Sequence, residues 1–132
     1  MLLVDTNVLV DVLQNDPQWA DWSIAQLRAH AKLHALVINP VIYAEMSLSF
    51  STLEALDDVV STMELEMREI PGPALFLAAR AFAQYRRRGG NKVQVLPDFF
   101  IGAHAALEGW PLLTRDANRF KTCFPTLDVI AP

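Results

Sequence analysis

Residues 1–10 read MLLVDTNVLV, and the polar stretch inside this segment decides how the rest of the chain is interpreted. Residues 2–4 are an apolar run of the kind found in a strand that is buried on both faces of a parallel sheet. The polar residues 5–7, Asp-Thr-Asn, stand where such a strand ends, and a short helix is predicted over residues 8–13. The segment therefore predicts a buried strand whose carboxyl end carries polar side chains.

The remaining chain continues the alternation of short apolar strands and amphipathic helices. Further strands are predicted at residues 36–38, 67–70, 112–114 and 127–130. Helices are predicted over residues 17–31, 41–48, 53–63, 73–88 and 98–108, with Asp16 and Ser51 as N-caps. Strands that alternate with helices indicate an α/β fold with three layers, in which helices flank a short parallel sheet. Without an internal repeat or a linker, we expect one domain over residues 1–132.

The composition is that of a folded protein without a membrane segment. The chain has 132 residues, of which 52% are hydrophobic and 20% are charged, so it can bury a full core. Asp5 precedes every Lys and Arg, which is unlike a secretory signal, and no apolar run reaches the roughly 18 residues of a membrane helix. The single cysteine, Cys123, fits a reducing compartment. We therefore expect a soluble, cytoplasmic protein.

The net charge of −4 conceals one basic stretch. Residues 86–121 contain seven Lys and Arg against three Asp and Glu, a net charge of +4, whereas the remainder carries −8. An acidic protein with such a stretch can still present a positive surface to phosphate. Arg86, Arg87, Arg88 and Lys92 are the candidate phosphate contacts, although a run of Arg at a helix end is also explained as a solvated end that complements the helix dipole.

Four carboxylates are predicted near the carboxyl ends of the strands, where ligands bind in open parallel sheets. They are Asp5, Glu45, Asp98 and Asp116. Each has an ordinary explanation, since an Asp can cap a helix or form a turn and a helical Glu can be solvated. Those explanations do not account for acids that recur at several strand ends. If the side chains converge, they repel one another unless a divalent cation compensates them, and an oxygen-only set favours Mg²⁺ or Mn²⁺.

The order of four short motifs resembles one known family. VDTNVL is followed by a Glu in the helix after the second strand, then by LPDFFIGAHA and by LLTRDANRF. This order is similar to that of the PIN-domain nucleases, in particular the VapC-like toxins of prokaryotic toxin–antitoxin pairs. The resemblance covers essentially the whole chain and implies a three-layer α/β/α fold with a short parallel sheet.

The resemblance also implies roles for individual residues. Asp5, Glu45, Asp98 and Asp116 would be the acidic quartet of the family, with Asp5 and Asp98 as the main ligands of Mg²⁺ or Mn²⁺ and the other two as supporting ones. Thr6, Asn7 and Thr114 would orient the quartet through hydrogen bonds. Arg115 would either neutralise a phosphate or pair with a carboxylate. The implied reaction is the hydrolysis of an RNA phosphodiester, assisted by the metal ion.

The implied partners are an RNA substrate, a cognate antitoxin that lies over the acidic site and a second copy of the chain, with no membrane. A non-catalytic PIN-like module that binds RNA or a protein remains the main alternative. Phosphotransfer enzymes and receiver domains are disfavoured, because the position two residues after Asp5 is Asn7 rather than a second Asp and no paired acids follow the first strand.

Overall fold

A computed structural model describes residues 1–90 and 96–132. Its strands are β1 (Leu2–Val4), β2 (Leu36–Ile38), β3 (Glu66–Met67), β4 (Leu112–Leu113) and β5 (Val129–Ile130). Its helices are α1 (Thr6–Leu13), α2 (Ala20–Ala31), α3 (Pro40–Ser47), α4 (Leu53–Thr62), α5 (Gly72–Arg87), α6 (Leu96–Glu108) and α7 (Ala117–Lys121). No helix within these residues is long and apolar enough to cross a membrane.

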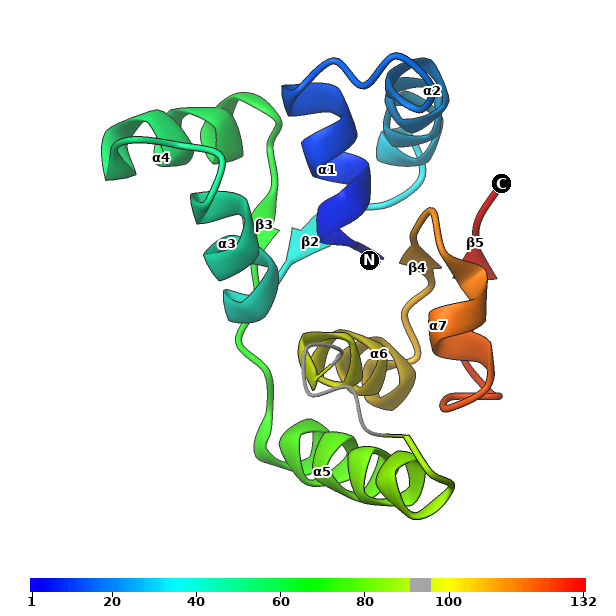
Figure 1. Cartoon of the computed structure of the whole chain (residues 1–132). Helices are drawn as coiled ribbons and strands as arrows, with labels where there is room; N and C mark the ends of the chain where they lie inside the picture. Colours follow the sequence, from blue (N-terminus) through cyan, green and yellow to red (C-terminus); the bar gives the residue numbers. More distant parts are fainter. Residues whose placement is uncertain (91–95) are drawn as a thin grey trace.

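The five strands form one parallel sheet in the order β3-β2-β1-β4-β5. Helices α1 and α2 lie on one side of this sheet and helices α5 and α6 on the other (Figure 1). This arrangement confirms the predicted three-layer α/β/α fold. Because β1 is central, its carboxyl end lies between the carboxyl ends of β2 and β4, as the topology of an open parallel sheet requires.

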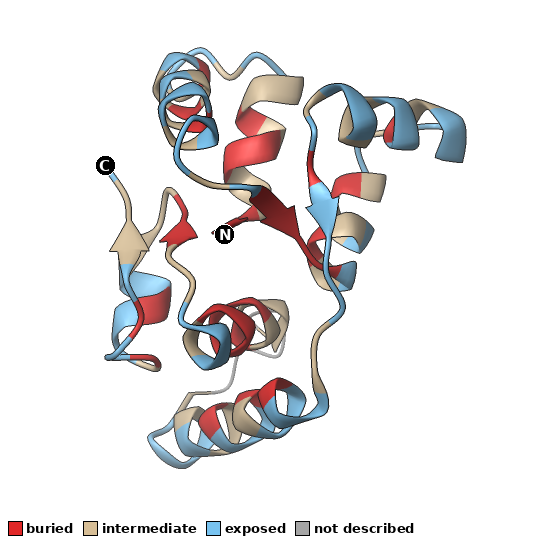
Figure 2. Cartoon of the chain, turned by 180° about the vertical axis from the view of Figure 1, so that it is seen from behind, coloured by how far each residue is buried: buried red, intermediate tan, exposed pale blue. Residues whose placement is uncertain are grey.

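The core consists of the central strands and the helix faces that cover them. All residues of β1, β2 and β4 are buried, whereas β3 is an exposed edge strand (Figure 2). Helix α6 contributes a continuous buried segment, Ile101–Ala105. Gly102 is needed there, because a Cβ atom at this position would lie 2.5 Å from the ring of Phe124. The fully buried strands explain why their sequences are apolar without alternation.

Several predicted boundaries are wrong by a few residues, each for a local reason. Helix α1 begins at Thr6, because Asp5 itself is the N-cap and its carboxylate accepts the Thr6 N–H at 2.7 Å. Helix α4 is capped by Thr52 rather than Ser51, since the Thr52 hydroxyl accepts the Ala55 N–H. Asp16 caps a turn before α2, which begins only at Ala20.

Two further differences concern strand β3 and helix α7. Strand β3 is predicted at residues 67–70 and is found at Glu66–Met67, where it pairs only with β2 and leaves both residues exposed. An edge strand with no buried face carries no apolar pattern that would reveal it. Helix α7 is not predicted at all, because the sequence after Asp116 is equally compatible with a turn.

Candidate active site

Asp5 is the best anchored of the candidate carboxylates. It follows β1 directly, and its side chain is 3% exposed. One carboxylate oxygen accepts the Thr6 N–H, and the other accepts the Thr114 hydroxyl at 2.7 Å. Thr114 follows β4, the neighbour of β1 in the sheet, so the two strand ends are joined through these side chains. This double hydrogen bond fixes the orientation of the Asp5 carboxylate.

Thr6 connects Asp5 to the next candidate acid. Its hydroxyl donates to Glu45 Oε1 at 2.7 Å, and Glu45 lies on α3, the helix that follows β2. A buried contact ties α3 to α6, because the Asn39 amide and His104 Nδ1 are 3.2 Å apart. Burial lowers the pKa of His104, which favours the neutral ring at neutral pH, and Nδ1 accepts that hydrogen bond in the tautomer whose proton is on Nε2. The helices that carry Glu45 and Asp98 are therefore held together from within the core.

Asn7 and Thr114 form the remaining hydrogen bonds at this edge. The Asn7 amide nitrogen lies 3.4 Å from Thr114 Oγ1, and Asn7 Oδ1 accepts the Arg115 N–H at 3.2 Å. Thr114 Oγ1 also accepts the Asp116 N–H at 3.1 Å. One threonine hydroxyl thus contacts Asp5, Asn7 and the backbone of Asp116. The structure thus brings together Thr6, Asn7 and Thr114, the three residues that the resemblance implied as orienting groups.

Asp98 and Asp116 share a counter-ion that sequence reasoning missed. Arg119 Nε lies 2.8 Å from Asp116 Oδ2, and Arg119 Nη1 lies 3.4 Å from Asp98 Oδ2. The Asp98 side chain is 15% exposed and that of Arg119 is 53% exposed. Arg119 reaches both acids because α7 places it three residues after Asp116 on the same side of the helix. Recognising α7 in the sequence would have suggested the pair of Arg119 with Asp116, whereas the pair with Asp98 depends on how α7 lies beside α6.

The pKa values of Asp5 and Asp98 are both raised, by burial and by neighbouring carboxylates. The pKa of Asp5 is raised to about 6, chiefly by burial and also by the charges of Asp98 and Glu45, while the hydrogen bonds from Thr114 and Thr6 act in the opposite direction. Burial also raises the pKa of Asp98, as do Glu45 and Asp116, whereas Arg119 lowers it. Mutual repulsion among partly buried carboxylates creates a site where added positive charge is favourable.

The donor chemistry of this site fits a hard divalent cation. Asp5, Glu45, Asp98 and Asp116 offer only carboxylate oxygens, the ligands that Mg²⁺ and Mn²⁺ prefer. In the part of the chain that the structure describes, no three Asp, Glu, His or Cys side chains converge closely enough to form a finished ligand set. Arg119 already pairs with two of the four acids. A bound metal ion would therefore share these carboxylates with Arg119 or displace Arg119 from them.

Arg115 takes the second of the two roles that the sequence left open for it. Its Nε atom lies 2.7 Å from Oδ2 of Asp11, a buried residue of α1 that also accepts the hydroxyl of Ser23. The guanidinium lies 5.5 Å from the centre of the Trp19 ring. These contacts join the segment after β4 to α1 and α2. The sequence did not single out Asp11, because its partner is distant along the chain.

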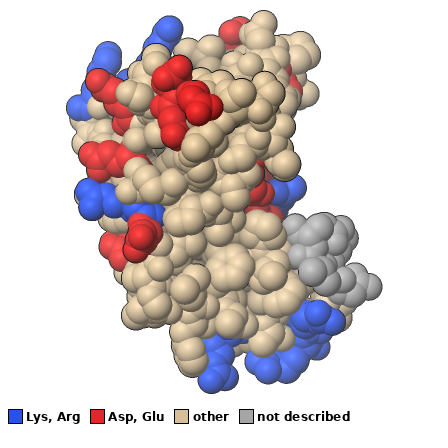
Figure 3. Space-filling view, turned by 90° about the vertical axis from the view of Figure 1, so that its left-hand side faces the viewer, with Lys and Arg blue, Asp and Glu red and all other residues tan. Residues whose placement is uncertain are grey.

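Arg86, Arg87 and Arg88, the first residues of the basic stretch, lie on the helix that precedes Asp98 in the chain. Arg86 and Arg87 occupy the last turn of α5 and Arg88 is its C-cap, and all three are exposed. Figure 3 shows Lys and Arg side chains gathered at the lower end of the molecule, where α5 lies. Arg88 is near enough to Cys123 to lower the pKa of the thiol, although burial raises it by more. Lys92 lies outside the described residues.

Comparisons with known proteins agree with this architecture. The family model that matches the chain is that of the PIN domain, over residues 2–124. Among solved structures, VapBC2 from Rickettsia felis bound to a promoter DNA fragment has a TM-score of 0.76 at 18% identity and covers 98% of this chain and 97% of its own. DNA-bound VapBC from Salmonella typhimurium has a TM-score of 0.73 at 18% identity, with 98% and 96% covered. A toxin-antitoxin complex from Klebsiella pneumoniae has a TM-score of 0.67 at 21% identity, with 100% and 98% covered. No curated protein sequence matches.

Proposed function

Because the chain belongs to the PIN domain family, we propose that it is a Mg²⁺- or Mn²⁺-dependent ribonuclease and the toxin of a toxin–antitoxin pair. One observation carries the proposal. Four carboxylates from four separate segments lie at the carboxyl edge of the sheet, and hydrogen bonds orient two of them through Thr6 and Thr114. A purely structural role does not require several mutually repelling acids at one edge, since repulsion raises the free energy of the fold.

In the proposed reaction, Asp5 and Asp98 are the main ligands of the ion and Glu45 and Asp116 support it. Mg²⁺ or Mn²⁺ held by these residues would lower the pKa of a water molecule and polarise the phosphoryl oxygen. The protein supplies the geometry, since Thr114 holds Asp5 in one orientation and Thr6 holds Glu45. Arg119, which is half exposed, neutralises part of the acidic charge in the absence of an ion, and its guanidinium would be available to a phosphate oxygen if an ion compensated Asp98 and Asp116.

Cleavage of single-stranded RNA by the purified protein tests this function directly. We expect products with Mg²⁺ or Mn²⁺, none with EDTA, and recovery of cleavage when the metal is added back. Binding of RNA without cleavage under any metal condition would instead support the non-catalytic alternative.

The basic stretch is proposed to contact RNA phosphates outside the carboxylate site. Replacing Arg86, Arg87 and Arg88 together with Ala should weaken RNA binding for every sequence, and the slope of log Kd against log salt should fall by about one for each phosphate that the protein no longer neutralises. Binding in EDTA at several salt concentrations measures this slope. The matched control replaces Arg28 and Lys32 at the end of α2, which are also exposed cations. An unchanged slope in the triple variant would leave the three residues as a solvated helix end.

Exposed apolar residues support the proposed protein partners. Leu48 and Leu53, at the junction of α3 and α4, are 89% and 60% exposed, and Phe76 on α5 is 62% exposed. Where such side chains form a continuous patch, a protein partner commonly covers it. We propose an antitoxin, by analogy with the similar toxin–antitoxin complex from Klebsiella pneumoniae, and a homodimer built on helix faces.

Sedimentation of the purified chain and its recovery from the native host test these partners. We expect a dimer at micromolar concentration and a co-purifying small protein that suppresses cleavage. A monomer that is recovered without any bound protein would contradict both partner proposals and would leave the ribonuclease assay unaffected.

A further inference from the structure

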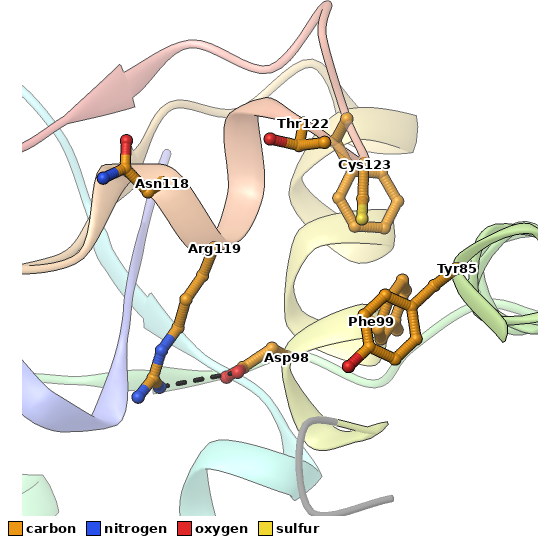
Figure 4. Close-up of a pocket in the computed structure, with 8 residues that line it drawn as sticks. Tyr85, Asp98, Phe99, Asn118, Arg119, Thr122 and Cys123 are labelled. Atoms are coloured by element: carbon orange, nitrogen blue, oxygen red, sulfur yellow. Dashed lines mark hydrogen bonds and ion pairs between the residues drawn. The ribbon is translucent and has the colours of Figure 1, made fainter. Parts of the chain in front are cut away.

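An apolar pocket of about 270 Å³ lies directly beside the carboxylate site. Asp98 and Arg119 line its side nearest the carboxylates, and Tyr85, Phe99 and Cys123 line the other side (Figure 4). The pocket is thus continuous with the site proposed to cleave RNA, although none of the groups proposed for the reaction explains its apolar walls.

The walls of the pocket are rigid aromatic groups. The rings of Tyr85 and Phe99 are 5.5 Å apart between centroids, and Phe99 packs edge-on against Phe124 at 6.1 Å. Phe99 and Phe124 are each only 5% exposed, and Gly102 allows the close approach of Phe124 to α6. The exposed residues Asn118, Arg119 and Thr122 form a polar rim above this floor. The pocket therefore combines apolar faces with hydrogen-bonding groups at its edge.

We propose that this pocket binds one unpaired nucleobase of the RNA, next to the phosphodiester at the carboxylate site. A nucleobase has two apolar faces and a polar edge, which matches an aromatic floor below a polar rim, and stacking on aromatic side chains is a general mode of single-strand recognition. Two arginines flank the pocket, since Arg119 stands at one side, where it pairs with the carboxylate of Asp98, and Arg88 lies near Cys123 at the other. This inference rests on the proposed ribonuclease function.

Removing one base at a time from a single-stranded RNA tests the pocket. We expect kcat/KM to fall by about tenfold when the base is missing at one position beside the cleaved bond, and to change little at more distant positions. Cys123→Phe, which fills the pocket, should lower kcat/KM by a similar factor with intact RNA. With the RNA that lacks that base, the variant and the unaltered protein should have the same kcat/KM. The control is Ser61→Phe, which adds the same bulk at an exposed position on α4.

Cys123 is the only cysteine of the chain and provides a second measurement on the unaltered protein. Its alkylation by N-ethylmaleimide in EDTA should slow severalfold when an intact RNA oligonucleotide is present, and much less with the oligonucleotide that lacks the critical base. This readout does not need cleavage and is unaffected if Cys123→Phe fails to fold.

The outcomes separate the pocket from the function on which it rests. RNA cleavage that is insensitive to every base removal would overturn the pocket and leave the ribonuclease standing. A protein that cleaves no RNA under any metal condition would refute the proposed function, and equal alkylation with and without RNA would then refute the pocket as well. If Cys123→Phe cleaves normally but no longer binds the antitoxin, the pocket belongs to the protein partner instead.

Discussion

Replacing Asp98 with Asn is expected to reduce Mg²⁺-dependent RNA cleavage by a factor of about a hundred to a thousand, the usual cost of removing one electrostatic stabiliser of a transition state. Asn keeps the size of the side chain but removes a full negative charge from the proposed ligand set. Metal affinity should fall together with cleavage, because a neutral amide binds Mg²⁺ more weakly than a carboxylate does. Cleavage rates over a Mg²⁺ titration, compared with the unaltered protein, measure both effects.

The stability of the same variant distinguishes a metal ligand from a structural residue. Burial and the neighbouring acids raise the pKa of Asp98, so its charged form is unfavourable in the metal-free fold. Its only polar side-chain contact among the described residues is the 3.4 Å pair with Arg119, which also contacts Asp116. Asp98→Asn should therefore be as stable as the unaltered protein in EDTA, or more stable. A variant that unfolds more easily and still cleaves RNA would contradict the assignment.

A matched control and a second variant sharpen this result. Asp58→Asn makes the same change of charge at an exposed position on α4 and should leave cleavage and metal affinity unchanged.

Asp5→Asn should also abolish cleavage, but its stability is harder to interpret. The Asp5 carboxylate accepts hydrogen bonds from both Thr6 and Thr114, and an amide has only one oxygen to accept them. Removing one of these bonds offsets part of the relief from repulsion.

The sequence was sufficient to predict the layers of the fold and the strand ends that Asp5 and Asp116 follow. Strands β1 and β2 are apolar throughout because both faces are covered, so their boundaries were predicted correctly at residues 2–4 and 36–38. Once a parallel sheet is inferred, acids that follow its strands must share one edge. For this reason Asp5 and Asp116 were placed together although they are 111 positions apart in the chain.

The contacts between these residues could not be predicted in the same way. Arg119 reaches Asp98 only because the five-residue helix α7 exists, and a helix this short has too few positions for an apolar stripe to show. The pairing of Arg115 with Asp11 joins segments about a hundred positions apart and depends on how α1 packs beside β4. Periodicity describes one element at a time, so contacts between elements require the tertiary structure.

The contribution of Asp5 to the stability of the metal-free protein is expected to fall as the pH rises from about 4 to 7. Burial raises the pKa of Asp5 from 3.8 to about 6. An acid with a raised pKa in the folded state binds its proton more tightly there than in the unfolded chain. Its contribution to stability is therefore fully present below pH 3.8 and disappears as the pH passes 6. Two pKa units correspond to at most about 3 kcal/mol.

Asp5→Asn isolates this contribution, because the variant keeps every other titrating group. We expect the unfolding free energy of the unaltered protein, relative to that of Asp5→Asn, to fall across this pH range in EDTA. Urea unfolding at half-unit pH intervals measures the difference. The pKa of Asp98 is also raised, so the unfolding free energy of the unaltered protein relative to that of Asp98→Asn should fall over the same pH range. If the unfolding free energies of the unaltered protein and both variants depend on pH in the same way, neither carboxylate has a raised pKa in the folded state.

Mg²⁺ should reverse the loss at neutral pH, because an ion binds the ionised carboxylates and thereby stabilises the folded state in which they meet. The increase in Tm on adding Mg²⁺ should therefore be large at pH 7.5, small at pH 4.5, and much reduced at both in Asp5→Asn and Asp98→Asn. Asp58→Asn should respond as the unaltered protein does. An increase that is independent of pH and of both site variants would mean that the ion binds elsewhere, and the carboxylate edge would then be left with a capping role alone.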